Sequence, residues 1–170
     1  MYKILYVPDP ALRRKAAKLN KVSREDVALS KKMIDIMKSA PGVGLAANQI
    51  GVFKQIVTIN IQDEENTINK LYALFNPEIK RYSKKTIVME EGCLSLPKQF
   101  AEIERPESIE IEYLDENNKI IQEKKTGYEA RVLQHEIDHL SGKLFIDYLS
   151  NLKKNIIIKR VIKLKKIGEI

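Results

Sequence analysis

Both histidines of the chain and one glutamate lie close together in residues 130–142, which read Ala-Arg-Val-Leu-Gln-His-Glu-Ile-Asp-His-Leu-Ser-Gly. On a helix, His135 and His139 are one turn apart on one face, the spacing at which two imidazoles bind the same divalent metal. Glu136 follows the first histidine, so its carboxylate can reach a water on that metal without being a ligand, as a general base does in metal-assisted hydrolysis. The alternative is an amphipathic helix whose histidines have this spacing by chance.

The origin of the third metal ligand decides the class of enzyme. A metzincin peptidase would have a third histidine where this chain has Phe145, so that class is excluded. A thermolysin-like site would use a downstream glutamate, but the only acids after the motif are Asp147 and the nearly C-terminal Glu169. Upstream, the single cysteine, Cys93, offers a thiolate, a strong ligand for Fe²⁺, Zn²⁺, Co²⁺ or Ni²⁺. With the two histidines it would leave one position open for water, as in a catalytic site. A lone cysteine is otherwise more often a small buried apolar residue.

Three segments resemble the motifs of the peptide deformylase family, and they occur in the family's order. They are Gly42-Val43-Gly44-Leu45-Ala46-Ala47-Asn48-Gln49, Glu91-Gly92-Cys93-Leu94-Ser95 and Gln134-His135-Glu136-Ile137-Asp138-His139. The likeness extends from about Pro41 to Ser150, with Asn48 in a variable slot and Arg131 in a stretch where many relatives are apolar. The resemblance implies a hydrolase that removes the formyl group from the N-terminal formyl-methionine of newly synthesised polypeptides. It also implies Fe²⁺ as the usual metal, with Zn²⁺, Ni²⁺ or Co²⁺ as substitutes.

The same resemblance assigns roles to further residues. A water on the metal would attack the formyl carbonyl, with Glu136 as general base and then as general acid toward the departing amine. The side-chain amide of Gln49 and the backbone N–H of Leu94 would stabilise the developing oxyanion. Gly44 and Leu45 would offer backbone groups to the peptide, which would bind as an added strand.

The residues around the methionine side chain can be inferred in part from helix geometry. Positions three, four and seven residues before the first histidine lie on its side of the helix, so they should border the cavity beside the metal. The expected pocket consists of these residues and two others: Val43, Met89, Tyr128, Arg131 and Val132. The alternative is that they are core residues.

The helix that carries the histidines has recognisable ends. Thr126 and Glu129 have the spacing of a capping box, and Gly142 is suited to the C-terminal end. Within the helix, Asp138 lies three residues after the first histidine. Arg105 is the expected partner that holds this carboxylate in a supporting position near the metal.

An earlier helix should precede the glycine-containing motif. Ser23 and Asp26 form a second capping-box pattern, and the helix that they start should end before Pro41. Gly42 and Gly44 then allow backbone conformations closed to other residues and a close approach to a ligand.

Short β-rich runs separate the two helices. The pattern predicts strands over 55–61, 71–75 and 86–89, a turn over 62–66, a hairpin of 108–113 with 119–121, and a strand-like segment over 144–146. The fold class that follows is α+β, as one domain over residues 1–170. Antiparallel or mixed sheets should pack around the histidine helix, with a further helix at the C-terminus.

Composition limits the class of protein. A chain of 170 residues with 44% hydrophobic content can bury one good core. One cysteine excludes a disulfide framework and fits a reducing compartment. The N-terminus has no apolar run long enough for a signal peptide, and no segment approaches a membrane span. We therefore expect a cytoplasmic protein, or an organellar one if a leader has been removed, with no membrane partner.

The positive charge is concentrated at the C-terminus. Residues 151–170 carry a net +6 of the total +7. The pattern predicts a basic amphipathic helix over about 151–167. Its apolar stripe is Ile157, Ile158, Val161, Ile162 and Leu164, and its basic flank is Lys159, Lys163 and Lys166. The helix is either a solvated face docked on the core or a contact with an anionic surface, which for a deformylase would be the ribosome rather than DNA.

Two other functions remain open at this point. A metallo-aminopeptidase or amidase would use the same ligands and the same base. A non-catalytic basic RNA-binding protein with a structural metal would explain the C-terminal charge, but it would leave Glu136 and Gln49 without roles.

Overall fold

The computed structural model describes residues 2–63 and 68–170. The helices are α1 (Arg24–Ser39), α2 (Gly127–Leu140) and α3 (Asn151–Lys166), with 3-10 helices η1 (Pro10–Arg13), η2 (Ala47–Ile50) and η3 (Phe145–Tyr148). The strands are β1 (Gly44–Ala46), β2 (Ile56–Asp63), β3 (Ile68–Tyr82), β4 (Thr86–Cys93), β5 (Leu96–Pro106), β6 (Ser108–Leu114) and β7 (Ile120–Thr126).

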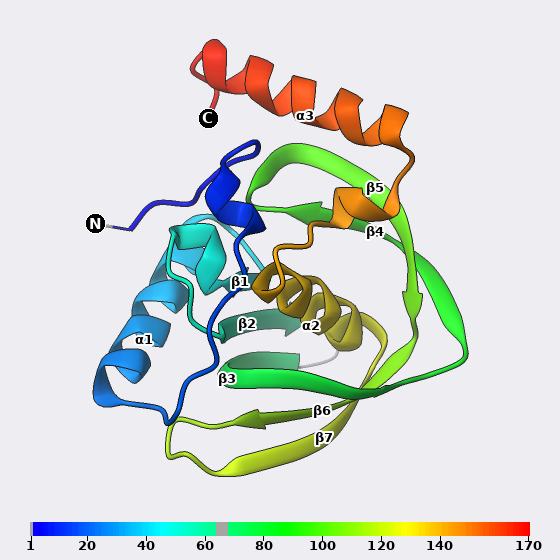
Figure 1. Ribbon diagram of the computed structural model, residues 1–170. Coiled ribbons are helices and arrows are strands. Elements are labelled where there is room, and N and C mark those ends of the chain that lie inside the picture. Colours follow the sequence, from blue (N-terminus) through cyan, green and yellow to red (C-terminus); the bar gives the residue numbers. More distant parts are fainter. Residues whose placement is uncertain (1, 64–67) are drawn as a thin grey trace.

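The strands form two antiparallel sheets on either side of α2. One sheet has the order β1-β2-β3-β6-β7, and the other is the β4–β5 pair. Figure 1 shows α2 in the middle of the molecule, with the larger sheet on one side, the long curved β4–β5 ribbon on the other, and α3 beyond that ribbon. Helix α1 packs on β1 and β2, and α3 packs on β5 and η3. The expected α+β architecture around the histidine helix is therefore confirmed.

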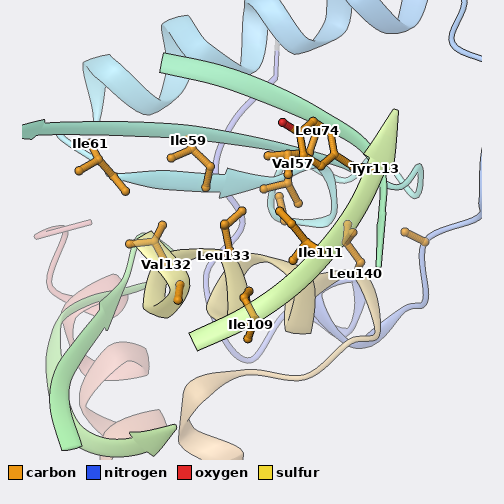
Figure 2. Packing of buried hydrophobic residues seen from close by; sticks show 13 residues of the cluster. Val57, Ile59, Ile61, Leu74, Ile109, Ile111, Tyr113, Val132, Leu133 and Leu140 are labelled. Atoms are coloured by element: carbon orange, nitrogen blue, oxygen red, sulfur yellow. The ribbon is translucent and has the colours of Figure 1, made fainter. Parts of the chain in front are cut away.

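An apolar cluster joins α2 to the five-stranded sheet (Figure 2). From the helix, Val132, Leu133 and Leu140 point toward the sheet, and Leu133 is fully buried. The sheet side of the cluster includes Val57, Ile59, Ile61, Leu74, Ile109, Ile111 and Tyr113. Burying one such aliphatic side chain stabilises the fold by about 1.5–3 kcal/mol, so this contact accounts for much of the hold on α2.

Helix α1 begins as its sequence predicts. The Ser23 hydroxyl accepts a hydrogen bond from the backbone N–H of Asp26 at 3.2 Å, and the Asp26 carboxylate accepts one from the backbone N–H of Ser23 at 3.0 Å. The helix ends at Ser39, before Pro41. The capping box is confirmed.

The predicted strands exist, but most are longer than their patterns indicate. β3 continues past Phe75 to Tyr82, with a shift in its register against β6 between Phe75 and Glu78, where Asn76 has a φ of 51°. The β6–β7 hairpin is confirmed, with Leu114 paired to Ile120. Of the turn expected over 62–66, residues 62 and 63 belong to β2, and 64–66 lie outside the described residues. Strands β1 and β5 had no counterpart in the sequence prediction.

Two local predictions are wrong. Thr126 is the N-cap of α2, but its side chain makes no capping hydrogen bond. The Glu129 carboxylate is instead bonded to Lys70 on β3, to Tyr72 on β3 and to Lys125 on β7, so tertiary partners replace the local cap. Residues 144–146, expected to be strand-like, lead into η3, where the Asp147 carboxylate accepts the backbone N–H of Leu144 at 2.9 Å and holds a turn.

The C-terminal helix lies where the charge pattern predicts it. α3 spans Asn151–Lys166, with Ile157 and Val161 buried and its lysine flank exposed. The Ser150 hydroxyl accepts the backbone N–H of Lys153 at 3.3 Å and caps the helix. None of the helices in the described part of the chain is long and apolar enough to cross a membrane.

Candidate active site

Three potential metal ligands converge between α2 and the end of β4. Cys93 is the last residue of β4, and His135 and His139 lie on α2. The Cys93 Sγ is 3.3 Å from the Nε2 of His139, which is 3.3 Å from the Nε2 of His135. All three ligand atoms lie within 4.8 Å of one another, and both imidazoles are buried. The structure thus brings together the three residues that the sequence singled out.

This donor set fits a divalent transition metal. The Nδ1 of His135 is hydrogen-bonded to Glu91 at 2.8 Å, so its Nε2 is the nitrogen turned toward Cys93 and His139. One thiolate and two imidazoles suit Zn²⁺, Fe²⁺, Co²⁺ and Ni²⁺, and three protein donors leave a position for water or substrate. The arrangement therefore has the form of a catalytic metal site, with a donor set that all four metals accept.

Glu136 is buried beside the three ligands. Among the described residues, its Oε2 atom has no hydrogen-bond partner. Burial raises the pKa of Glu136 to about 7, against the lowering effect of a protonated His135. A carboxyl group with such a pKa can both take and give a proton near neutral pH.

The glycine-containing motif makes room for that carboxylate. A Cβ atom at Gly44 would lie 2.5 Å from the Oε1 of Glu136, so only glycine fits on this strand. The glycines of the described residues that have positive φ are Gly51, Gly127, Gly142 and Gly168, so the expected special backbone conformation of Gly42 and Gly44 is wrong. The two glycines do allow a close approach, but the approaching groups are protein side chains rather than a ligand. A Cβ at Gly42 would clash with the side chain of Leu94.

Gln49 directs its amide nitrogen toward the end of β4. Its Oε1 accepts the backbone N–H of Ala46 at 2.9 Å, which leaves Nε2 to donate to the Ser95 hydroxyl at 3.1 Å and to the Cys93 Sγ at 3.5 Å. Leu94 lies between these two partners, in the turn from β4 to β5. Ser95 received no role in the sequence analysis, although it closes the second motif.

Glu91 is the centre of a buried ionic network that the sequence analysis did not identify. Its carboxylate accepts hydrogen bonds from Arg105 at 2.6 and 2.9 Å, from Arg131 at 2.8 Å and from the Nδ1 of His135 at 2.8 Å. Although burial opposes ionisation, the bonds from His135 and Arg105 hold the pKa of Glu91 well below its usual range. The available signal was that Glu91 and Cys93 are two residues apart on one strand and so face the same way.

The predicted pair of Arg105 and Asp138 is present. The Nη1 of Arg105 donates to Asp138 at 2.8 Å and to the Tyr148 hydroxyl at 3.0 Å. The stronger, two-pronged contact of this arginine is with Glu91, so its main effect on the site passes through Glu91 rather than through Asp138.

A cavity of about 470 Å³ opens beside these groups. Its lining includes Val43, Gly44, Tyr128, Arg131 and Val132, together with Glu136 and the first histidine. Tyr128 is 49% exposed, so the core interpretation of this residue fails, whereas Val132 belongs both to the apolar cluster and to the lining. Among the described residues, Leu45 and Met89 are not part of that lining.

Comparison with known proteins gives one consistent family. Residues 1–155 match the family model described as polypeptide deformylase. A peptide deformylase from Pelagibacter ubique is 49% identical over 162 residues, covering 95% of this chain and 94% of the relative. The crystal structure of peptide deformylase from Ehrlichia chaffeensis has a TM-score of 0.94 at 36% identity, covering 100% of this chain and 99% of that one. The structure of that enzyme in complex with actinonin has a TM-score of 0.91 at 38% identity, covering 96% of both chains.

Proposed function

Because the chain belongs to the polypeptide deformylase family, hydrolases that remove formyl groups, we propose that it acts on the N-terminal formyl-methionine of newly synthesised polypeptides. The products are formate and a peptide with a free N-terminal amine. The observation that carries this proposal is the convergence of Cys93, His135 and His139 beside the buried, unpaired carboxylate oxygen of Glu136. In this role, the enzyme works in the compartment where formylated chains are made, which for a bacterial-type enzyme is the cytoplasm.

Cys93, His135 and His139 would hold the metal, and the family resemblance favours Fe²⁺ as the native one. When bound, such an ion supplies Lewis acidity that makes water more acidic and the formyl carbonyl more electrophilic. The chain's part is to fix three donors and to keep their surroundings dry. Both imidazoles are buried, and the Nδ1 contact of His135 with Glu91 fixes its ring orientation.

Glu136 carries the proton in this mechanism. Its carboxylate removes a proton from the attacking water, whose oxygen then bonds to the formyl carbon. As the C–N bond breaks, the same carboxyl group gives that proton to the departing amine nitrogen. The Oε2 atom, which has no hydrogen-bond partner among the described residues, is available for both steps.

Gln49 and Leu94 would stabilise the negative charge that develops on the formyl oxygen. The Gln49 amide is oriented by its bond to Ala46, so its nitrogen is preset toward the site and costs little reorganisation. Leu94 would add its backbone N–H from the β4–β5 turn.

The peptide would bind along the edge of the larger sheet. β1 is an edge strand, paired with β2 on one side only, so the backbone groups of Gly44 and Leu45 can accept an added strand. The methionine side chain would enter the cavity lined by Val43, Tyr128 and Val132. For Met89, which lies outside that lining, a contact with the substrate stays a prediction.

The direct test is to follow two peptides that differ only at the N-terminus. We expect formate release from formyl-methionyl peptide and no cleavage of the same peptide with a free amine. Release of methionine from the free-amine peptide would instead identify an aminopeptidase, and hydrolysis of unrelated linear amides would identify a general amidase.

The metal is tested by purification without oxygen, followed by metal analysis. We expect about one divalent ion per chain, loss of activity with a chelator, and return of activity with Fe²⁺, Ni²⁺ or Co²⁺. Full activity of a metal-free sample would overturn the metal-dependent mechanism.

We also propose that α3 contacts the ribosome. Its basic flank of Lys159, Lys163 and Lys166 is exposed, while its apolar stripe is partly covered by the core. Phosphate contacts release counterions, so the affinity should fall steeply as salt concentration rises.

Replacing Lys159, Lys163 and Lys166 with glutamine should weaken ribosome binding and leave hydrolysis of short formyl peptides unchanged. The matched control replaces Lys31, Lys32 and Lys38, which are exposed on α1, and makes the same change in charge on another surface. Equal effects of the two triple variants would show that only net charge matters, and loss of short-peptide activity would mean that α3 is a structural brace.

A further inference from the structure

Arg131 is buried in α2, and its guanidinium reaches across to both strands of the β4–β5 ribbon. Its Nη1 atom donates to Glu91 on β4 at 2.8 Å and to the backbone oxygen of Ile103 on β5 at 2.7 Å, and its Nη2 atom donates to the backbone oxygen of Ile87 on β4 at 2.6 Å. One side chain of the histidine helix thus binds the strand that ends in Cys93 at two points and its partner strand at a third.

The contact with Glu91 links Arg131 to the imidazole of His135. The same Oε2 atom of Glu91 accepts from Arg131 and Arg105, while Oε1 accepts from the Nδ1 of His135. Glu91 can hold the imidazole in one orientation only if its own carboxylate is fixed. Arg105 fixes it from β5, and Arg131 fixes it from the helix that carries the histidine.

Charge balance supports this role. The buried network contains two carboxylates, Glu91 and Asp138, and two guanidinium groups, Arg105 and Arg131. Without Arg131 the network would carry an excess negative charge in a site that is 3–4% exposed at Glu91 and its two arginines. Arg105 would then have to pair with both carboxylates, and the Oε2 atom of Glu91 would lose one of its two arginine partners, so the carboxylate would be held less firmly.

We propose that Arg131 is a positioning residue of the metal centre, which sets the His135 imidazole and the Cys93 strand relative to each other through Glu91. This inference rests on the proposed metal-dependent function. It predicts that Arg131 matters for binding of a metal to the substrate-free protein. A residue that only lined the cavity would change peptide KM alone.

The test uses Co²⁺, which reports affinity by competition with a chelator and ligand geometry by visible absorption. In Arg131→Met, which keeps the stem and removes the guanidinium, we expect about tenfold weaker Co²⁺ binding and altered d–d bands, at the low end of the range for residues that support ligands. In Arg131→Lys, which keeps the charge but not the three-way contact, the loss should be smaller. Glu129→Gln is the control, because it breaks ion pairs between α2 and the other sheet.

A double-mutant cycle with Glu91→Gln separates positioning from bracing. If Arg131 acts through Glu91, Arg131→Met should weaken Co²⁺ binding much less in the Glu91→Gln background than in the wild type. Unchanged Co²⁺ affinity and spectrum in Arg131→Met, or additive losses in the cycle, would overturn the proposal. If Arg131→Met fails to fold, Arg131→Lys decides by the same criteria. Failure of the wild-type protein to bind Co²⁺ would instead count against the proposed metal site.

Discussion

Beyond its first turn, where Glu129 forms ion pairs with Lys70 and Lys125 of the five-stranded sheet, the two sides of α2 are held by different forces. Toward the five-stranded sheet, the helix presents Leu133 and Leu140 to an apolar cluster. Toward the β4–β5 ribbon it presents charged and polar groups: Arg131 reaches Glu91, Asp138 reaches Arg105, and the Gln134 amide donates to the backbone oxygen of Pro106 at 2.9 Å. The three potential metal ligands lie at the second of these contacts.

The difference between the two sides suggests that one side stabilises the position of α2 in the fold and the other sets the geometry of its histidines. Apolar burial is roughly proportional to area and does not depend on direction, so it holds the helix firmly but tolerates small shifts. Charged hydrogen bonds between buried groups add little net stability, because desolvation offsets much of their attraction, but they require specific distances and angles. We infer that the apolar side keeps α2 in the fold and that the polar side aims its histidines at Cys93.

The largest effect should come from Glu136→Ala. The substitution removes the proton carrier and leaves the three metal ligands intact, so turnover should fall by about 10²- to 10⁴-fold while the metal content stays the same. Steady-state kinetics and metal analysis on the same preparation measure both. Activity within tenfold of wild type would rule out Glu136 as the base, and loss of metal would mean that this residue also supports a ligand.

Cys93→Ser should weaken metal binding strongly. A serine hydroxyl is a harder and weaker donor than a thiolate, so the affinity for Co²⁺ should fall by more than about a hundredfold, beyond the usual cost of losing a supporting residue. The absorption band of the thiolate bound to Co²⁺ should disappear. Unchanged affinity with the band still present would show that Cys93 is not a ligand.

Leu133→Ala tests the opposite side of the helix. Removing a fully buried leucine should lower the free energy of unfolding by about 2–5 kcal/mol, as measured by urea denaturation. Co²⁺ affinity of the folded variant should stay within about twofold of wild type, since additivity is expected for contacts that share no partners. A large loss of affinity in Leu133→Ala would break the division between the two sides.

The sequence predicted the histidine helix, its place in the core and the three residues that converge at its end. These predictions succeed because H-E-x-x-H fixes two ligands by helix geometry alone, and because a chain with one cysteine offers one choice of thiolate. The C-terminal helix could also be predicted from the sequence, because its apolar residues, such as Ile157 and Val161, recur at helical spacing.

The parts that the sequence did not reveal depend on contacts between distant segments. β5 was missed because two of its buried positions are the polar residues Gln99 and Arg105, so the alternation of apolar and polar residues that marks a strand is interrupted. Helix geometry placed Arg131 beside the cavity, as the structure does, but it did not reveal the contacts of its guanidinium. Its partners lie 28 to 44 residues away, and no local pattern marks them. The predicted capping box of Thr126 was wrong for the same reason, because the Glu129 carboxylate is hydrogen-bonded to Lys70 and Tyr72 on β3 instead.

The smallest effect should come from a substitution in an ionic cluster at the surface. This substitution tests whether charge pairing by itself stabilises the β4–β5 side of the molecule. Asp147 on η3 accepts from Arg13 at 2.5 and 3.1 Å, from Lys154 on α3 at 2.5 Å and from the backbone N–H of Leu144 at 2.9 Å. Burial works against ionisation, but these bonds lower the pKa of Asp147 to about 2. Because the carboxyl is more acidic in the folded state than its value of about 3.9 in unfolded chains, its contribution is present above pH 4 and is lost as the pH falls from about 4 to about 2.

Asp147→Asn should therefore lower the free energy of unfolding of the metal-free protein by no more than about 1 kcal/mol at pH 6, since Arg13 is 39% exposed and its charge is screened by solvent. The difference from wild type, measured by urea denaturation, should shrink as the pH falls toward 2. A difference that stayed constant with pH would assign the effect to hydrogen-bond geometry rather than to charge. A loss of several kcal/mol would show that a partly exposed ion cluster can stabilise the fold as strongly as apolar burial, and the proposed difference between the two sides of α2 would then be wrong.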